Sequence, residues 1–129
     1  MQSSQIFLIE DDKDDQEIFI AALEELYNPV NCTTAMNGYE GYNQLITKQV
    51  KPDVIFLDLN MPLMNGYEFL EKIKQEDQLK NIPVIILTTS SNPQTIREVK
   101  HLGAKKFLTK PGSFTELTNL LQTTLMNPL

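Results

Sequence analysis

The sequence predicts an α/β domain in which five strands alternate with five helices. Short apolar runs alternate along the chain with longer segments whose apolar residues recur at helical spacing. Three of the runs are apolar at every position, which is typical of parallel strands that are covered on both faces. Strict alternation of strands and helices implies a doubly wound parallel sheet with right-handed crossovers and helices on both faces.

The predicted strands differ in how strongly the sequence marks them. The continuous apolar runs are residues 6–9, 54–57 and 84–87, and weaker runs lie at 30–34 and 106–109. Four prolines fall between the predicted elements, namely Pro29, Pro52, Pro83 and Pro111. Proline has no amide proton to give to a helix or a sheet, so these positions agree with the predicted boundaries.

Amphipathic segments fill the intervals between the strands. We expect these apolar residues to face the sheet, helix by helix: Ile18, Ala21, Ala22 and Leu26; Tyr42, Leu45 and Ile46 within 38–48; Tyr67, Leu70 and Ile73; Ile96, Val99 and Leu102; and Leu117, Leu120, Leu121 and Leu125. Gly103 follows the fourth helix, where a left-handed residue is favoured. Asn65 and Gly66 form a strand-to-helix loop, because helical spacing follows them.

The net charge is concentrated in one short window. The 129 residues carry 17 acidic and 11 basic side chains, so the formal charge is 11 − 17 = −6. Residues 10–17 hold six acids and one base and contribute −5, so the rest of the chain sums to −1. An acidic balance argues against nucleic acid or an anionic membrane as the main partner. The single Cys32 excludes an internal disulfide and a cysteine metal site.

The length fits one domain, since domains most often have about 100–150 residues. We expect a single domain over 1–129 with no output domain, because about three residues follow the last predicted helix. The N-terminus does not resemble a signal sequence, and no apolar stretch approaches the ~18 residues of a membrane span. The expected location is therefore cytoplasmic.

Polar side chains follow four of the predicted strands. Glu10 and Asp11 follow the first strand, Asp58 the third, Thr88 the fourth and Lys110 the fifth. Sheets of this kind bind ligands beyond the carboxyl ends of their strands, so these residues are expected to meet at one edge. Carboxylates a few ångströms apart repel by about 4 kcal/mol per pair at an effective dielectric near 20. A proton or a cation must therefore compensate them.

The set of donor atoms indicates a hard cation and a phosphoryl group. Carboxylate oxygens without His or Cys favour Mg²⁺, which keeps several waters and leaves room for a phosphate oxygen. Lys110 is suited to balance the charge of a phosphoryl group, and Thr88 to donate a hydrogen bond to it. Asp58, at the end of the central apolar strand, is the natural covalent acceptor and would form an aspartyl phosphate.

Four sequence blocks closely resemble the receiver domain of two-component response regulators. They are residues 7–12, 52–62 together with Asn65-Gly66, 83–90, and Lys110-Pro111, and they occur in the family's order and spacing over essentially the whole chain. The resemblance implies a flavodoxin-like fold with strand order 2-1-3-4-5. The hydroxyl run 88–91 and the lack of an output domain also resemble the stand-alone receivers that serve phytochrome-type sensor kinases.

The resemblance also implies roles for individual residues. Asp58 would accept a phosphoryl group from a phosphohistidine of a sensor histidine kinase or a histidine phosphotransfer protein. Mg²⁺ would be bound by Asp11, by Asp58, by Glu10 mainly through water, and by the backbone carbonyl of Asn60. Thr88 and Lys110 would contact the phosphoryl group, and the Lys110–Pro111 peptide bond would be cis.

Phosphorylation is expected to act through a switch made of Thr88 and Phe107. Thr88 would move toward the phosphate, Phe107 would move inward, and the surface of the fourth helix, fifth strand and fifth helix would change for a downstream protein. The same surface could hold a homodimer. Two positions depart from the commonest family pattern: Phe107 replaces a frequent Tyr, and Thr89 stands where Ala or Ser is common. The domain would modify only itself, so it is not predicted to be an enzyme.

Simpler interpretations account for some of these residues. Asp14, Asp15 and Glu17 are expected to stabilise the start of a helix by about 0.3–1 kcal/mol each. The sequence leaves open whether Asp12 joins the metal site. Ser91 or Asn92 is expected to cap the fourth helix.

Three other functional classes make different demands on the sequence. A flavodoxin-like electron carrier would need small residues and hydroxyls after the first strand, where this chain has acids. A phosphatase with an aspartyl intermediate would carry a second acid at the position of Asn60. A scaffold that works without phosphate stays open on sequence grounds.

Overall fold

The computed structural model describes residues 5–28 and 30–126. Strands and helices alternate strictly, as expected. Their order is β1 (Gln5–Ile9), α1 (Lys13–Glu24), β2 (Asn31–Ala35), α2 (Gly38–Ile46), β3 (Val54–Leu57), α3 (Gly66–Lys74), β4 (Val84–Thr88), α4 (Pro93–His101), β5 (Lys106–Thr109) and α5 (Phe114–Met126). The predicted strand positions are confirmed to within one residue at either end.

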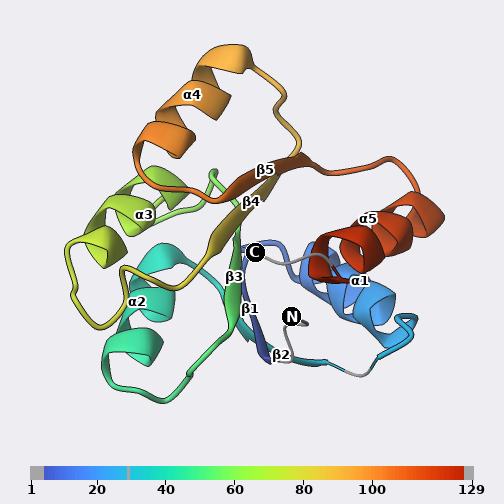
Figure 1. Cartoon of the computed structure of the whole chain (residues 1–129), viewed down its shortest axis with the longest axis horizontal. Helices are drawn as coiled ribbons and strands as arrows, with labels where there is room; N and C mark the ends of the chain where they lie inside the picture. The colour runs from blue at the N-terminus through green and yellow to red at the C-terminus, as the bar shows by residue number, and fades with distance from the viewer. Residues whose placement is uncertain (1–4, 29, 127–129) are drawn as a thin grey trace.

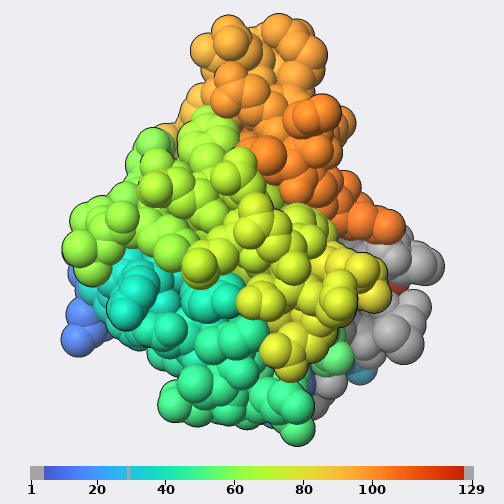
Figure 2. Space-filling model, turned by 90° about the vertical axis from the view of Figure 1, so that its left-hand side faces the viewer, coloured from blue at the N-terminus to red at the C-terminus, as the bar shows by residue number. Residues whose placement is uncertain are grey.

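The strands form one parallel sheet in the order β2-β1-β3-β4-β5, which is the predicted order. Helices α1 and α5 cover one face of the sheet, and α2, α3 and α4 cover the other (Figure 1). Figure 2 shows α2, α3 and α4 side by side on the second face, with α4 standing out from the rest. The central strand β3 is thus covered on both sides, and β2 and β5 are the edges.

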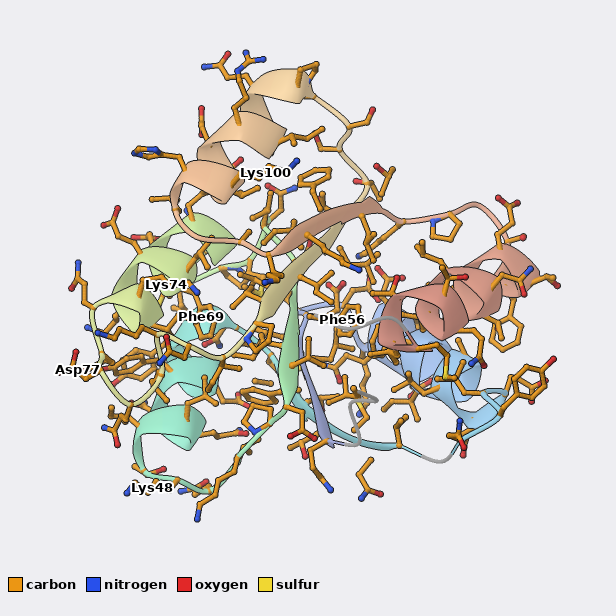
Figure 3. The ribbon with its side chains drawn as sticks, viewed as in Figure 1. Lys48, Phe56, Phe69, Lys74, Asp77 and Lys100 are labelled. Atoms are coloured by element: carbon orange, nitrogen blue, oxygen red, sulfur yellow. The ribbon has the colours of Figure 1, made fainter. Side chains whose placement is uncertain are left out.

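Alternate residues of the central strands supply two separate cores. Phe7, Ile55 and Ile86 belong to a cluster that packs under α2, α3 and α4. Their immediate neighbours along the strands belong to a second cluster under α1 and α5, which includes Leu8, Phe56 and Ile85. Phe56 and Phe69 accordingly lie on opposite sides of the sheet (Figure 3). This alternation explains why the strand sequences are apolar at every position.

The inward face of α1 differs from the prediction. Its buried residues are Gln16, Phe19, Ala22 and Leu23, whereas Ile18 is 47% exposed. Residues 18–23 are all apolar, so their spacing alone did not define one face. The expectation that Ile18 faces the sheet is therefore wrong.

Two local predictions about helix ends are confirmed. Asn92 caps α4, because its side chain accepts a hydrogen bond from the amide of Gln94. Gly103 follows α4 with φ +107°, a backbone conformation that disfavours any side chain. Among residues 5–28 and 30–126, no helix has the length and apolar content that crossing a membrane requires.

Candidate functional site

Adjacent strands deliver the acidic residues to one point. Strand β1 ends at Ile9 opposite Leu57 of β3, so the residues that follow these strands are neighbours. The amide of Asp58 donates to the carbonyl of Ile9 at 3.1 Å, which extends the ladder by one residue. On the other side of β1, the amide of Glu10 donates to the carbonyl of Ala35 at 3.0 Å. The backbone at both acids is thereby fixed by the sheet.

Glu10, Asp11 and Asp58 form a compact carboxylate cluster. One ligand oxygen from each lies within 4.8 Å of the others. Glu10 and Asp58 are buried, with 3% and 8% exposure, and Asp11 is half-buried. A set of carboxylate oxygens without nitrogen or sulfur fits a hard divalent cation.

Lys110 is the cation that lies against this cluster. Its amide donates to the carbonyl of Thr88 at 2.7 Å, which holds the residue at the end of β5. Its ammonium donates to Oε1 of Glu10 at 2.6 Å and to Oδ2 of Asp15 at 3.2 Å. The single positive charge of Lys110 therefore faces several carboxylates and does not balance them all. The carboxylate cluster can still bind a further cation.

Burial shifts the pKa values of the clustered groups. It raises the pKa of Glu10 from an ordinary 4.5 to about 7, although the hydrogen bond from Lys110 opposes the rise. Burial also raises the pKa of Asp58, against the attraction of the Lys110 charge. For Lys110, burial acts to lower the pKa, but the hydrogen bond and charge of Glu10 outweigh it and raise the pKa. Near neutral pH, the Glu10 carboxyl is therefore protonated in part of the molecules and ionised in the rest.

Thr88 brings an unpaired hydroxyl to the same edge of the sheet. It is the last residue of β4 and is 1% exposed. Its Oγ1 has no hydrogen-bond partner among the described residues. A buried hydroxyl without a partner costs about 1–3 kcal/mol, so its position at a strand end points to an acceptor that arrives from outside the chain.

The loop after Asp58 is tightly packed by the start of α3. Asn65 caps α3 and forms a reciprocal capping box with Glu68. A β-carbon at Gly66 would lie 2.6 Å from the carbonyl oxygen of Asp58, so only glycine fits there. The helix thus begins directly against the backbone of Asp58.

One implied feature of the site is wrong. The described residues contain no cis peptide bond, so the Lys110–Pro111 bond is trans rather than cis. The trans form is favoured by about 0.5–1 kcal/mol before proline. Lys110 makes its backbone bond to Thr88 and its side-chain bond to Glu10 with the trans peptide. Neither contact requires the rarer isomer.

The other implied residues are placed as follows. Phe107 is half-buried on β5 opposite Ile86 and packs against the core under α2, α3 and α4. Asn60 lies exposed, two residues after Asp58. Asp12 caps α1 by accepting a hydrogen bond from the amide of Asp15, and it lies outside the carboxylate cluster. In this structure the Asp12 side chain is thus used as a helix cap.

The sequence interpretation missed two residues that support the site. Asp15 pairs with Lys110 as well as lying in the first turn of α1. The buried Gln16 donates to the carbonyl of Glu10 at 2.7 Å. Gln16 precedes Phe19 by three residues, so both lie on the same, buried face of α1. A polar residue on that face was the feature of the sequence that could have predicted its role.

A cavity of about 270 Å³ lies beside Lys110, between α1 and the start of α5. Its polar lining comes from Glu10, Asp15, Lys110 and Ser113. Ile18 and Phe114 line it as partly exposed apolar residues. The cavity therefore adjoins Lys110 and Glu10, whereas Asp58 does not line it.

Known proteins have a similar fold and a related sequence. The crystal structure of the phosphorylated cyanobacterial phytochrome response regulator RcpA is similar, with a TM-score of 0.86 and 32% sequence identity. The match covers 94% of this chain and 90% of the RcpA chain. The Mn²⁺-bound form of response regulator Rcp1 covers 98% and 97%, with a TM-score of 0.85 and 29% identity. Response regulator Rcp1 of Synechocystis is 40% identical over 72 residues, which are 56% of this chain and 49% of that protein.

The chain spans less than half the length of several curated relatives that it matches. Over its own length the match is nearly complete, because residues 6–122 fit the response regulator receiver domain. The five-stranded parallel sheet in the order 2-1-3-4-5 agrees with this match and makes the fold flavodoxin-like. The chain therefore belongs to the family of response regulator receiver domains.

Proposed function

We propose that this chain is a stand-alone response regulator that accepts a phosphoryl group on Asp58 in an Mg²⁺-dependent reaction. The observation that carries the proposal is the cluster of Glu10, Asp11 and Asp58, with its ligand oxygens within 4.8 Å of one another. The donor is a phosphohistidine of a sensor histidine kinase or a histidine phosphotransfer protein. Phosphoryl transfer of this kind is a general property of the family to which the chain belongs.

The chain's own residues divide the work of transfer. An oxygen of the Asp58 carboxylate forms the new bond to phosphorus, while the bond from phosphorus to the donor nitrogen breaks and the nitrogen keeps the electron pair. Lys110 supplies a positive charge beside the transferring group. The unpaired Oγ1 of Thr88 donates a hydrogen bond to a phosphoryl oxygen once that group is in place. The chain modifies itself and turns over no separate metabolite.

The carboxylate cluster fits a divalent cation, and we assign it to Mg²⁺. Glu10, Asp11 and Asp58 would hold the ion, and the backbone carbonyl of Asn60 would be a further ligand by the resemblance to the family. When bound, the ion neutralises charge on the transferring phosphoryl oxygens. The Mn²⁺-bound form of Rcp1, a structural neighbour, supports a divalent ion at a receiver domain of this shape.

The output of the domain is a change of surface. Thr88 moves toward the phosphoryl group and leaves space into which the half-buried Phe107 turns. The surface formed by α4, β5 and α5 then differs between the two states and controls a partner protein. A homodimer through the same surface and a cytoplasmic location complete the proposal.

The test is intact-mass analysis after incubation with Mg²⁺ and acetyl phosphate. The wild-type chain is expected to gain one phosphoryl group, and Asp58→Asn or removal of Mg²⁺ is expected to abolish the adduct. Asp77→Asn is the matched control, because Asp77 lies in the segment between α3 and β4 and pairs only with Lys80 among the described residues (Figure 3). An adduct that persists in Asp58→Asn, or none in the wild type, would refute the proposal.

A further inference from the structure

The ammonium of Lys110 is shared between two acids with different surroundings. Glu10 Oε1 accepts at 2.6 Å, and its side chain is 4% exposed. Asp15 Oδ2 accepts at 3.2 Å, and its side chain is 44% exposed. The described residues offer this ammonium no third hydrogen-bond acceptor. Two of its three N–H groups are therefore occupied before any phosphoryl group arrives.

The backbone of Asp15 is held in place at the start of α1. Its amide donates to the Asp12 cap at 3.0 Å, which places Asp15 in the first turn of the helix. Asp15 and Lys110 both line the cavity between α1 and the start of α5, whereas Asp58 does not. The attraction of Asp15 therefore draws the ammonium toward this cavity, which Asp58 does not line.

The two acids differ in what a bound cation does to them. Glu10 belongs to the carboxylate cluster, so a divalent ion would neutralise it and weaken its hold on Lys110. Asp15 lies outside that cluster, so an ion bound there would not contact it directly. After the metal site fills, Asp15 is the remaining competitor for the Lys110 ammonium.

We propose that Asp15 is a positioning residue that competes with the phosphoryl group for Lys110 and so weakens retention of that group on Asp58. The inference rests on the function proposed above and adds a residue that regulates the same site. An exposed ion pair contributes about 0.2–1 kcal/mol, which corresponds to a change in affinity of up to about fivefold.

The test measures how tightly the chain binds beryllofluoride, used as a phosphoryl stand-in, by calorimetry at saturating Mg²⁺. Asp15→Asn is expected to bind about 1.4- to fivefold more tightly than the wild type. Asp15→Glu keeps the charge and is expected to bind like the wild type. Asp14→Asn removes the same charge from the same helical turn, but Asp14 does not contact Lys110, so its affinity should not change.

Salt separates this competition from a change of shape. At about 1 M salt the Debye length is near 3 Å, so the ratio between Asp15→Asn and the wild type should fall toward one. Equal affinities at low salt, weaker binding by Asp15→Asn, or an equal gain in Asp14→Asn would each overturn the inference. A wild-type chain that binds no beryllofluoride would overturn the proposed function together with it.

Discussion

The interior of the sheet and the edge at the carboxyl ends of its strands use the same strands for opposite purposes. In the interior, Phe7, Ile55 and Phe56 are fully buried and contact apolar neighbours on either face. One residue beyond these strands, Glu10 and Asp58 are almost as deeply buried but are ionisable. The transition from one environment to the other occurs within a single residue of each strand.

Stability and chemistry are divided between these two regions of the molecule. Burying apolar side chains contributes about 25 cal/mol per Å² of apolar surface. Burying a carboxylate or an unpaired hydroxyl opposes folding. The interior must therefore provide the stability that the edge reduces. Substitutions in the two regions are expected to have effects of opposite sign.

The largest expected effect comes from the interior. Phe56→Ala should lower the free energy of unfolding by about 3–5 kcal/mol, because it removes a ring that packs edge-on against Phe19 at 5.1 Å between centroids. Urea unfolding followed by circular dichroism measures this change. The matched control is Tyr27→Ala, since Tyr27 is 88% exposed and should change stability by less than about 0.5 kcal/mol. A similar loss in both variants would show that Phe56 carries no special share of stability.

The pH dependence of stability tests the edge directly. The pKa of Glu10 is raised to about 7 in the folded chain, so the folded state binds more protons than the unfolded state between about pH 4.5 and 7. Stability of the metal-free chain should therefore fall as pH rises through this range, by on the order of 2–3 kcal/mol.

Two controls accompany the pH series. Glu10→Gln should flatten the fall, because the side chain no longer titrates. Mg²⁺ should oppose the fall in the wild type, since an ion that binds only the folded state stabilises it. An equally steep fall in Glu10→Gln would assign the titration to other groups.

Asp58→Asn should stabilise the metal-free chain by about 1–2 kcal/mol, because it replaces a buried carboxylate by a neutral amide. Burial already raises the pKa of Asp58, which shows that the ionised form is disfavoured there. Thermal unfolding without divalent ions measures the change. Asp77→Asn alters an exposed acid of the same kind and should change stability little. Destabilisation by Asp58→Asn would mean that the ionised group is favourably held by Lys110.

The contrast between the interior and the carboxyl edge of the sheet also explains what could be predicted from the sequence. The five strands followed from short apolar runs separated by segments with helical spacing, whereas their order followed from the resemblance to receiver domains. The carboxyl-edge residues followed from their place after those runs. The pairing of Asp15 with Lys110 joins residues 95 positions apart, and nothing local marks it. The inward face of α1 was ambiguous because residues 18–23 are all apolar.

The smallest expected effect isolates one hydroxyl at the edge. Thr88→Val should raise the free energy of unfolding by about 1 kcal/mol, since Oγ1 of Thr88 is buried without a partner in the described part of the chain. Thr124→Val is the matched control, because Thr124 is 4% exposed and its hydroxyl donates to the carbonyl of Leu120 at 2.7 Å. The control should lose about 1 kcal/mol instead. Changes of opposite sign in the free energy of unfolding would show that the unpaired hydroxyl of Thr88 destabilises the free protein. Equal losses in the two variants would show that the Thr88 hydroxyl has a hydrogen-bond partner in the free protein.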